Sequence, residues 1–393
     1  MSTISRLVRP MRPRDPAEPH RAATPLELLT DLCFVVAIAQ CALTLHHAIS
    51  EDHLADAAPH FVVAFFAIWW AWLNFAWFSS AYDNDDVPYR VLTLAQILGS
   101  LVLAAGIPRM FEDDFTLGVV GYVVMRLALV VQWWRASRQD PERRTTCRRY
   151  AIGIVVVQVG WILFLATPPQ LGLEFVALLV LCEFVVPVWA ERTGRTPWHP
   201  HHIAERYGLF LIIVLGETIL STTVAIQEAL DDEGHRVELL GVVVGGVLVV
   251  FSLWWLYFAR EAGDVLARLE TNAGAYAWGF GHYFVYASGA AVGAGLAARV
   301  DFWTDHSEAP AWQSAIAVTL PVAVFLAAWW AVCIRHHDAS ARTWAPVLLA
   351  VAVVLAGTLT PVPELVAGLV CLALLVLELR FGGLLGDAEP VHA

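Results

Sequence analysis

The stretch HIAERYGLFLIIVLGETILS, residues 202–221, decides what kind of protein this chain is. It begins with two charged residues, Glu205 and Arg206, and continues as an apolar run that contains one more carboxylate, Glu217. A run of about 20 apolar residues is long enough to cross a bilayer as a helix. A carboxylate in such a run costs ~2.5–3.5 kcal/mol if it faces lipid, so we expect Glu217 to face other helices. The stretch therefore predicts a membrane protein of several helices with a polar interior.

The composition of the whole chain supports a membrane location. Apolar residues make up 58% of the 393 residues, charged residues only 15%, and the mean hydropathy is +0.62. The formal net charge is −12, and the basic residues are scattered between apolar segments, which argues against a nucleic-acid partner. The six cysteines show neither a disulfide framework nor a zinc spacing. We find no motif of a nucleotide-binding or hydrolytic enzyme, so we expect no enzymatic activity and no cofactor.

Twelve apolar segments of suitable length can be drawn along the chain. They cover roughly residues 26–49, 59–79, 88–107, 115–137, 149–167, 171–190, 203–227, 237–259, 275–297, 312–334, 343–360 and 362–379. The connecting segments alternate between arginine-rich and acidic, which by the positive-inside rule places both termini in the cytoplasm. We therefore predict an all-α, multi-pass protein of the plasma membrane with about 12 transmembrane helices.

The second half of the chain repeats features of the first half in the same order. Asp31 corresponds to Glu217, and Gln96 corresponds to His282, at an offset of about 186 residues. This order predicts two parallel six-helix repeats. The predicted organisation is a cytoplasmic arm (1–25), a first six-helix half (26–190), a cytoplasmic His/Arg loop (191–202), a second six-helix half (203–380) and a cytoplasmic tail (381–393).

Three stretches carry a resemblance to a known family. They are ERYGLFLIIVLGETIL at residues 205–220, LELLTDLCFVVAIAQ at residues 26–40 and YDNDDVPYR at residues 82–90. Together they resemble the signature of the low temperature requirement protein A family of prokaryotic membrane proteins, and the hydropathy matches along nearly the whole chain. The family is named for a growth phenotype, so the resemblance implies a membrane location and no particular reaction.

Polar residues inside the apolar segments are the candidates for function, because ionisable groups within a membrane mark pathways or form buried ion pairs. We predict that they line a central polar site between the two halves. The candidates are Glu27, Asp31, Arg90, Gln96, Arg126, Glu183, Glu205, Arg206, Glu217 and His282.

Two of these candidates constrain each other. Glu27 and Asp31 are spaced i, i+4 and share a helix face, so they repel unless a cation, a proton or an arginine lies between them. Glu27 also occupies a helix start, where a carboxylate is favourable, and we prefer this account of it. For Glu217 we expect a position near Asp31 or His282, with an arginine close enough to neutralise it.

Two groups are weak candidates for a metal site. Asp83, Asp85 and Asp86 could hold a hard divalent cation through oxygen ligands. His202 and Glu205, spaced i, i+3, could bridge one zinc ion. Solvated loops explain both groups equally simply, so we predict no metal. His202 and His282 are also candidates for a proton relay, since histidine titrates near neutral pH.

Two functions are consistent with these features. The first is an ion or small-solute transporter or channel for a monovalent cation, a proton or a small solute. Residues 26–34 are similar to the first helix of a potassium-channel family whose units begin with a Phe-Ser-Asp motif, with Thr30 in place of the serine. The alternative is a non-transporting membrane protein of stress response or a scaffold, with structural ion pairs. Glycines at small-xxx-small spacing, such as Gly241/Gly245 and Gly289/Gly293, predict close helix contacts within one half or between the halves, and a homo-oligomer remains an open alternative.

Overall fold

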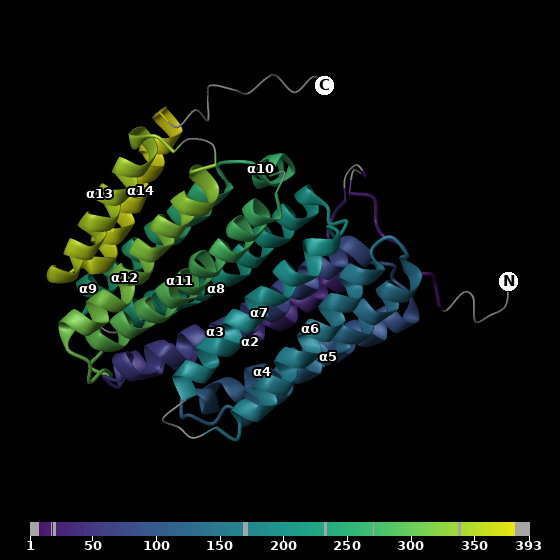
Figure 1. The fold of residues 1–393 in the computed structure, drawn as a ribbon. Coiled ribbons are helices and arrows are strands. Elements are labelled where there is room, and N and C mark those ends of the chain that lie inside the picture. Colours follow the sequence, from purple (N-terminus) through teal and green to yellow (C-terminus); the bar gives the residue numbers. More distant parts are fainter. Residues whose placement is uncertain are drawn as a thin grey trace. The chain divides into compact units, whose positions relative to one another are not determined.

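The computed structural model describes residues 8–16, 18, 21–167, 172–231, 234–269, 271–336 and 339–381. All regular structure in these residues is helical, and it includes twelve helices of 16 residues or more (Figure 1). In the first half of the chain they are α2 (Pro25–Ser50), α3 (Leu54–Tyr82), α4 (Val87–Met110), α5 (Thr116–Gln139), α6 (Arg144–Phe164) and α7 (Gly172–Ala190). In the second half they are α8 (Pro200–Asp231), α9 (Arg236–Phe258), α11 (Asn272–Trp303), α12 (Ala311–Trp329), α13 (Ala341–Ala356) and α14 (Pro363–Phe381).

Four shorter elements complete the described structure. They are the 3₁₀ turn η2 (Glu191–Thr193), the short helix α10 (Ala262–Arg268), the π turn η3 (Trp330–Ile334) and the 3₁₀ turn η4 (Gly357–Leu359). Of the predicted tail, 381–393, only residue 381 is among the described residues, and the predicted arm, 1–25, is described only in part.

The predicted all-α class is confirmed, and each predicted apolar segment coincides with one long helix. Within the described residues, nine helices are long and apolar enough to cross a membrane. The long helices outside these nine are α7, α11 and α14. Most of α11 is buried, so its composition suits contact with other helices better than contact with lipid.

Local sequence explains where α2 begins. Thr24 and Glu27 form a capping box: the Thr24 backbone N–H donates to Glu27 Oε2 at 2.8 Å, and the Glu27 N–H donates to Thr24 Oγ1 at 3.3 Å. Pro25 occupies the first turn, where its missing N–H costs nothing. The sequence Thr-Pro-Leu-Glu therefore fixes the start of α2 and the direction of the Glu27 side chain.

The chain divides into two compact units. The first contains the described parts of 1–41, 60–206 and 270–272, and the second contains those of 42–59, 207–269 and 273–393. The helices α2, α3 and α8 each contribute residues to both units.

In the first unit α4 packs on α5, α5 on α6 and α6 on α7. The contact between α4 and α5 is especially close: a Cβ at Gly121 would lie 2.4 Å from the backbone nitrogen of Leu103. The helix α3 is the most buried of the nine candidate spans, because 78% of the residues in its most apolar stretch are buried. It therefore provides the interior surface on which polar side chains of the first unit gather.

In the second unit α9 packs on α14, and α12 packs on α13 and α14. Gly245 of α9 faces the backbone of α14, where an added Cβ would lie 2.5 Å from the carbonyl carbon of Glu364. Gly293 of α11 faces α8, where an added Cβ would lie 2.8 Å from the carbonyl carbon of Glu217. Both glycines thus make the close helix contacts predicted from their spacing.

Candidate functional site

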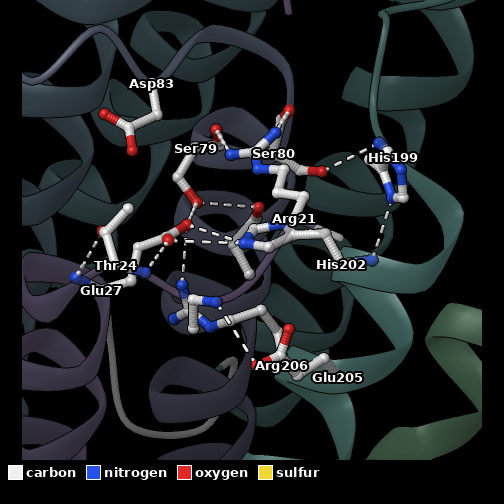
Figure 2. Close-up of polar contacts among 12 residues, drawn as sticks. Arg21, Thr24, Glu27, Ser79, Ser80, Asp83, His199, His202, Glu205 and Arg206 are labelled. Carbon is white, nitrogen blue, oxygen red and sulfur yellow. Dashed lines mark hydrogen bonds and ion pairs between the residues drawn. The ribbon is translucent and has the colours of Figure 1, made fainter. Parts of the chain in front are cut away.

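Four charged or titratable side chains are buried together in the first unit, where α2, α3 and the first turns of α8 meet, and Figure 2 labels three of them, Glu27, His202 and Arg206. We call Glu27, Asp31, His202 and Arg206 the charge cluster. None of the four residues is more than 2% exposed. Glu27 and Asp31 come from α2, and His202 and Arg206 come from α8. Residues far apart in the sequence therefore form one polar site inside a largely apolar protein.

Arg206 joins the two acids of the cluster. Its Nη1 lies 3.0 Å from Glu27 Oε1, and its Nη2 donates to Asp31 Oδ1 at 2.6 Å. The guanidinium also lies over the ring of Phe75, with 5.7 Å from its central carbon to the ring centre. A cation, a proton or an arginine could relieve the repulsion between Glu27 and Asp31. The structure shows that it is an arginine, Arg206.

Glu27 combines its capping role with a place in the cluster. One oxygen, Oε2, accepts the Thr24 N–H, and the other, Oε1, accepts a hydrogen bond from Ser79 Oγ at 2.6 Å. His202 Nε2 lies 3.3 Å from Oε1. Figure 2 shows Ser79, His202 and Arg206 around this one carboxylate. Glu27 therefore caps the start of α2, as we expected, and in addition binds Ser79, His202 and Arg206.

Four atoms of the cluster are buried without a hydrogen-bond partner: Asp31 Oδ2, His202 Nδ1, and Nε and Nη1 of Arg206, of which Nη1 takes part in the ion pair with Glu27. Asp31 accepts both of its hydrogen bonds on Oδ1, from Arg206 and from Trp72 Nε1 at 2.8 Å, and its Oδ2 has none. His202 uses Nε2 toward Glu27, and its Nδ1 has none. If both carboxylates are ionised, one guanidinium leaves an excess of one negative charge among them. A proton or a small cation would supply the missing positive charge.

Further polar groups surround the cluster on the N-terminal side of α2. Arg21 donates to the carbonyl oxygens of Ser79 and Ser80 and so satisfies the last turn of α3. Asp83 follows that turn directly and is 6% exposed. Burial, reinforced by the negative charge of Glu27, raises the pKa of Asp83 to about 6. Asp83 therefore titrates near neutral pH at the edge of the cluster.

The neighbouring acids of the run 82–90 pair with arginines. Arg90 donates from Nε and Nη2 to the two oxygens of Asp85 at 2.7 Å each, and both residues are exposed. Asp86 accepts the Tyr89 N–H at 2.9 Å, which caps α4, and pairs with Arg135 Nη2 at 2.7 Å. Arg90 is therefore a surface residue and does not reach the buried acids. Within the described residues, no group of three or more His, Cys, Asp or Glu side chains is arranged to hold a metal ion.

The histidine tract before α8 is also engaged by the protein itself. His199 Nδ1 accepts the backbone N–H of His202 at 3.2 Å, so its Nε2 carries the hydrogen and donates to the Glu18 carbonyl at 2.9 Å. Glu205 is exposed, and its Oε1 accepts the Ala23 N–H at 3.4 Å. The pair His202 and Glu205, considered as zinc ligands, therefore points in different directions.

A second buried acid of the first unit, Glu183 on α7, is completely surrounded by donors. Its two oxygens accept from Tyr122 OH at 2.7 Å, Arg126 Nη2 at 2.8 Å, Trp70 Nε1 at 2.9 Å, Gln158 Nε2 at 3.3 Å and Trp161 Nε1 at 3.4 Å. Five donors on one carboxylate stabilise its ionised form and fix the packing of α3, α5, α6 and α7. This network resembles a structural ion pair more than a binding site.

The remaining candidates of the first unit lie elsewhere. Gln96 donates to Gln132 Oε1 at 3.0 Å, and Gln132 donates to Thr93 Oγ1 at 3.4 Å, all between α4 and α5. Among the described residues, Gln96 forms no hydrogen bond to an acid. The polar residues predicted to line one site thus form several separate groups within the first unit.

Two parts of the expectation for Glu217 are wrong, its place beside His282 and its pairing with an arginine, whereas its expected place near Asp31 stays a prediction. Tyr207 lies beside His282, with ring centres 4.9 Å apart, whereas Glu217 is ten residues further along α8, or about 15 Å. Glu217 instead adjoins Gly293, and among the described residues no arginine forms an ion pair with it. His282 is enclosed by aromatic rings, and its Nδ1 bonds to the Trp278 carbonyl at 2.7 Å.

Sequence reasoning missed three participants in the cluster. They are Trp72, Ser79 and Arg21. The capping signature Thr24–Glu27 was a usable signal for the start of α2. Nothing in the sequence distinguishes the indole that bonds to Asp31 from the other sixteen tryptophans.

Nine candidate spans in the described residues and charged side chains buried between them define a multi-pass membrane protein. The chain belongs to the bacterial low temperature requirement A protein (LtrA) family, whose model matches residues 22–379. The resemblance inferred from three short stretches is therefore confirmed. The chain is also similar to an uncharacterized protein of Rhizobium meliloti (strain 1021), with 27% identity over 271 residues, 65% of this chain. The match spans 64% of that curated relative's length. No solved structure matches the chain.

Proposed function

We propose that this protein is an ion or small-solute transporter or channel of the plasma membrane, and that the charge cluster binds the transported species. The observation that carries the proposal is the unpartnered Asp31 Oδ2 beside an excess of acid over guanidinium. A site with this charge favours a proton or a monovalent cation over an anion. The proposal assigns the protein no catalytic reaction and no cofactor.

The position of the cluster supports a functional role. Both acids lie in α2 and both basic groups lie in α8, and each helix is a candidate membrane span. Ionisable side chains are expensive in such segments, and purely structural ones are expected to have every polar atom satisfied. Both oxygens of Glu183 accept hydrogen bonds, whereas Asp31 Oδ2 accepts none. The arginines of the two sites, Arg126 and Arg206, each have two nitrogens without a hydrogen-bond partner, so the difference lies in the carboxylates.

The twelve-helix arrangement with two parallel repeats is part of the proposal. In the first unit the last helix, α7, contacts the second, α3, through Glu183 and Trp70. In the second unit the last helix, α14, contacts α9, the second helix of that half, at Glu364 and Gly245. The same pairing in each half supports an internal repeat. The alternation of arginine-rich and acidic loops supports cytoplasmic termini.

Flux measurements in proteoliposomes test the proposal. Potassium, sodium and proton gradients are imposed separately on vesicles that contain folded protein. We expect flux in at least one gradient and at least a tenfold decrease in Asp31→Asn, which keeps the shape of the side chain and removes its charge. Arg90→Gln, which changes an exposed ion pair, serves as the matched control and should transport like the wild type. Absence of flux in all three gradients would contradict the proposal.

The second candidate is a non-transporting stress-response or scaffold protein, which the completely bonded Glu183 favours. In that case Asp31→Asn should lower stability, and no gradient should produce flux in the wild type. Flux and thermal stability of the same preparations therefore distinguish the two candidates.

A further inference from the structure

Glu217 lies in the second unit, close to the middle of α8. It is 17 residues from Pro200 and 14 residues from Asp231, or about 25 Å and 21 Å from the two ends of the helix. In the part of the chain that the structure describes, no hydrogen bond, ion pair or neighbouring charge reaches its carboxylate. Its environment is thus the opposite of that of Glu183.

The base of the Glu217 side chain is pressed against α11. A Cβ added at Gly293 would lie 2.9 Å from the Glu217 Cβ. The single hydroxyl hydrogen of Ser221 can be donated to either of two carbonyl oxygens at this contact, that of Glu217 at 2.9 Å or that of Gly293 at 2.8 Å. The next residue, Thr218, is completely buried, and its hydroxyl has no partner. The contact between α8 and α11 at Gly293 therefore includes two consecutive residues of α8, one with a carboxyl group and one with an unpartnered hydroxyl.

No charged group faces Glu217 from the helices packed around it. Residues 289–297 of α11 are glycine, alanine, valine and leucine only. The helix α9 approaches α8 at Gly246, where an added Cβ would lie 2.6 Å from Thr222 Oγ1, and its residues 239–251 are all apolar or glycine. On α8 itself Glu217 is the sole titratable residue between 207 and 228. An ionised carboxylate at this position would be neither solvated by bulk water nor paired with a positive charge.

We infer that Glu217 is a proton-binding site: a neutral carboxylic acid held in the interior of the membrane. This inference goes beyond the proposed function, because it concerns the second unit and does not require the charge cluster to carry an ion. It sets Glu217 apart from Glu183, whose carboxylate is held by five donors that include a guanidinium.

A hydrophobic carbodiimide distinguishes these states chemically. The carboxyl O–H adds across one C=N bond of the reagent, with the proton going to nitrogen and the carboxyl oxygen to the central carbon. The adduct rearranges to a stable N-acylurea without loss of any atom. A guanidinium-paired carboxylate such as Glu183 has no proton to supply. Access to Glu217 is open, since a Cβ added at the adjacent Gly216 would meet nothing within 4 Å.

The experiment treats the full chain in liposomes with dicyclohexylcarbodiimide and locates the adduct by mass spectrometry of its peptides. We expect the Glu217 peptide to be modified at least tenfold more than the Glu183 peptide, and the modification to decrease as the pH is raised. Glu217→Gln should remove this adduct. No adduct on Glu217 in folded protein, or equal modification of both glutamates, would overturn the inference.

An infrared difference spectrum of wild type against Glu217→Gln provides a second, reagent-free measurement. We expect the wild type to show the C=O stretching band of a protonated carboxylic acid that the variant lacks. If instead the variant loses only carboxylate bands, the inference is wrong. Neither measurement depends on flux. A negative result for Glu217 can therefore be told apart from a negative result for the proposed transport.

Discussion

At the scale of single residues, one arginine determines the character of the charge cluster. Arg206 has both acids of α2 within 3.0 Å, and it is completely buried. A buried ion pair need not stabilise a protein more than apolar packing would. Removal of one partner is costly, however, because the charges left behind lose the guanidinium that pairs with them.

Arg206→Gln should therefore lower the free energy of unfolding by about 3–5 kcal/mol. Denaturant titration in detergent measures the loss. The double variant Arg206→Gln with Asp31→Asn should recover part of it, since one of the two uncompensated carboxylates is then neutral. A loss below about 1 kcal/mol, typical of exposed pairs, would mean that the acids do not depend on Arg206.

Asp83 predicts a pH dependence of stability. Its folded pKa of about 6 lies above the ordinary value of 3.8, so the folded protein holds the proton more tightly than the unfolded chain. The protonated Asp83 side chain contributes its full stabilisation to the folded state below about pH 4. This contribution is lost as the pH rises through about 6, which lowers the free energy of unfolding by about 3 kcal/mol.

Asp83→Asn, which stays neutral, should thus be more stable than the wild type above about pH 6 and equally stable near pH 4. Unfolding curves of both proteins across this range measure the difference. Identical pH profiles would show that Asp83 titrates normally.

At the scale of elements, glycines set how closely the helices approach. A Cβ at Gly121 would meet Leu103 N at 2.4 Å and Gly99 O at 2.6 Å, both backbone atoms that cannot move independently of their helix. A Cβ at Gly216 of α8 would meet nothing within 4 Å. The two positions form a natural comparison, because both are helical and only one is crowded.

Gly121→Ala should destabilise the protein by about 1–3 kcal/mol, because α4 and α5 have to separate. Gly216→Ala should leave stability unchanged or raise it by about 0.5–1 kcal/mol through helix propensity. Thermal unfolding in one detergent measures both. Equal effects of the two substitutions would contradict the close contact between α4 and α5.

At the scale of the whole molecule, hydropathy was sufficient to predict the helices but not the pairing of their charges. Three arginines were available for the intramembrane acids, and composition cannot decide among them. Arg90 remains exposed with Asp85, Arg126 binds Glu183, and Arg206 joins the two acids of α2. The pairing depends on which faces of distant helices meet, and periodicity within one helix does not contain that information.

The number of crossings is the prediction that belongs to this scale. Twelve crossings place both termini on one side of the membrane, whereas nine would place them on opposite sides. Reporter fusions at each terminus, one active only in the cytoplasm and one only outside it, read this directly. We expect both termini to report the cytoplasm, and opposite signals would exclude an even count.

The separation of Asp31 and Arg206 has a consequence for biosynthesis. The two residues are 175 positions apart. At about 5–20 residues per second, a ribosome adds Asp31 roughly 10–35 s before it reaches the arginine. During that interval the acids of α2 lack the Arg206 guanidinium. They have to be kept neutral by protons or held out of lipid by the insertion machinery, so the last step in assembling this site is set by the order of translation.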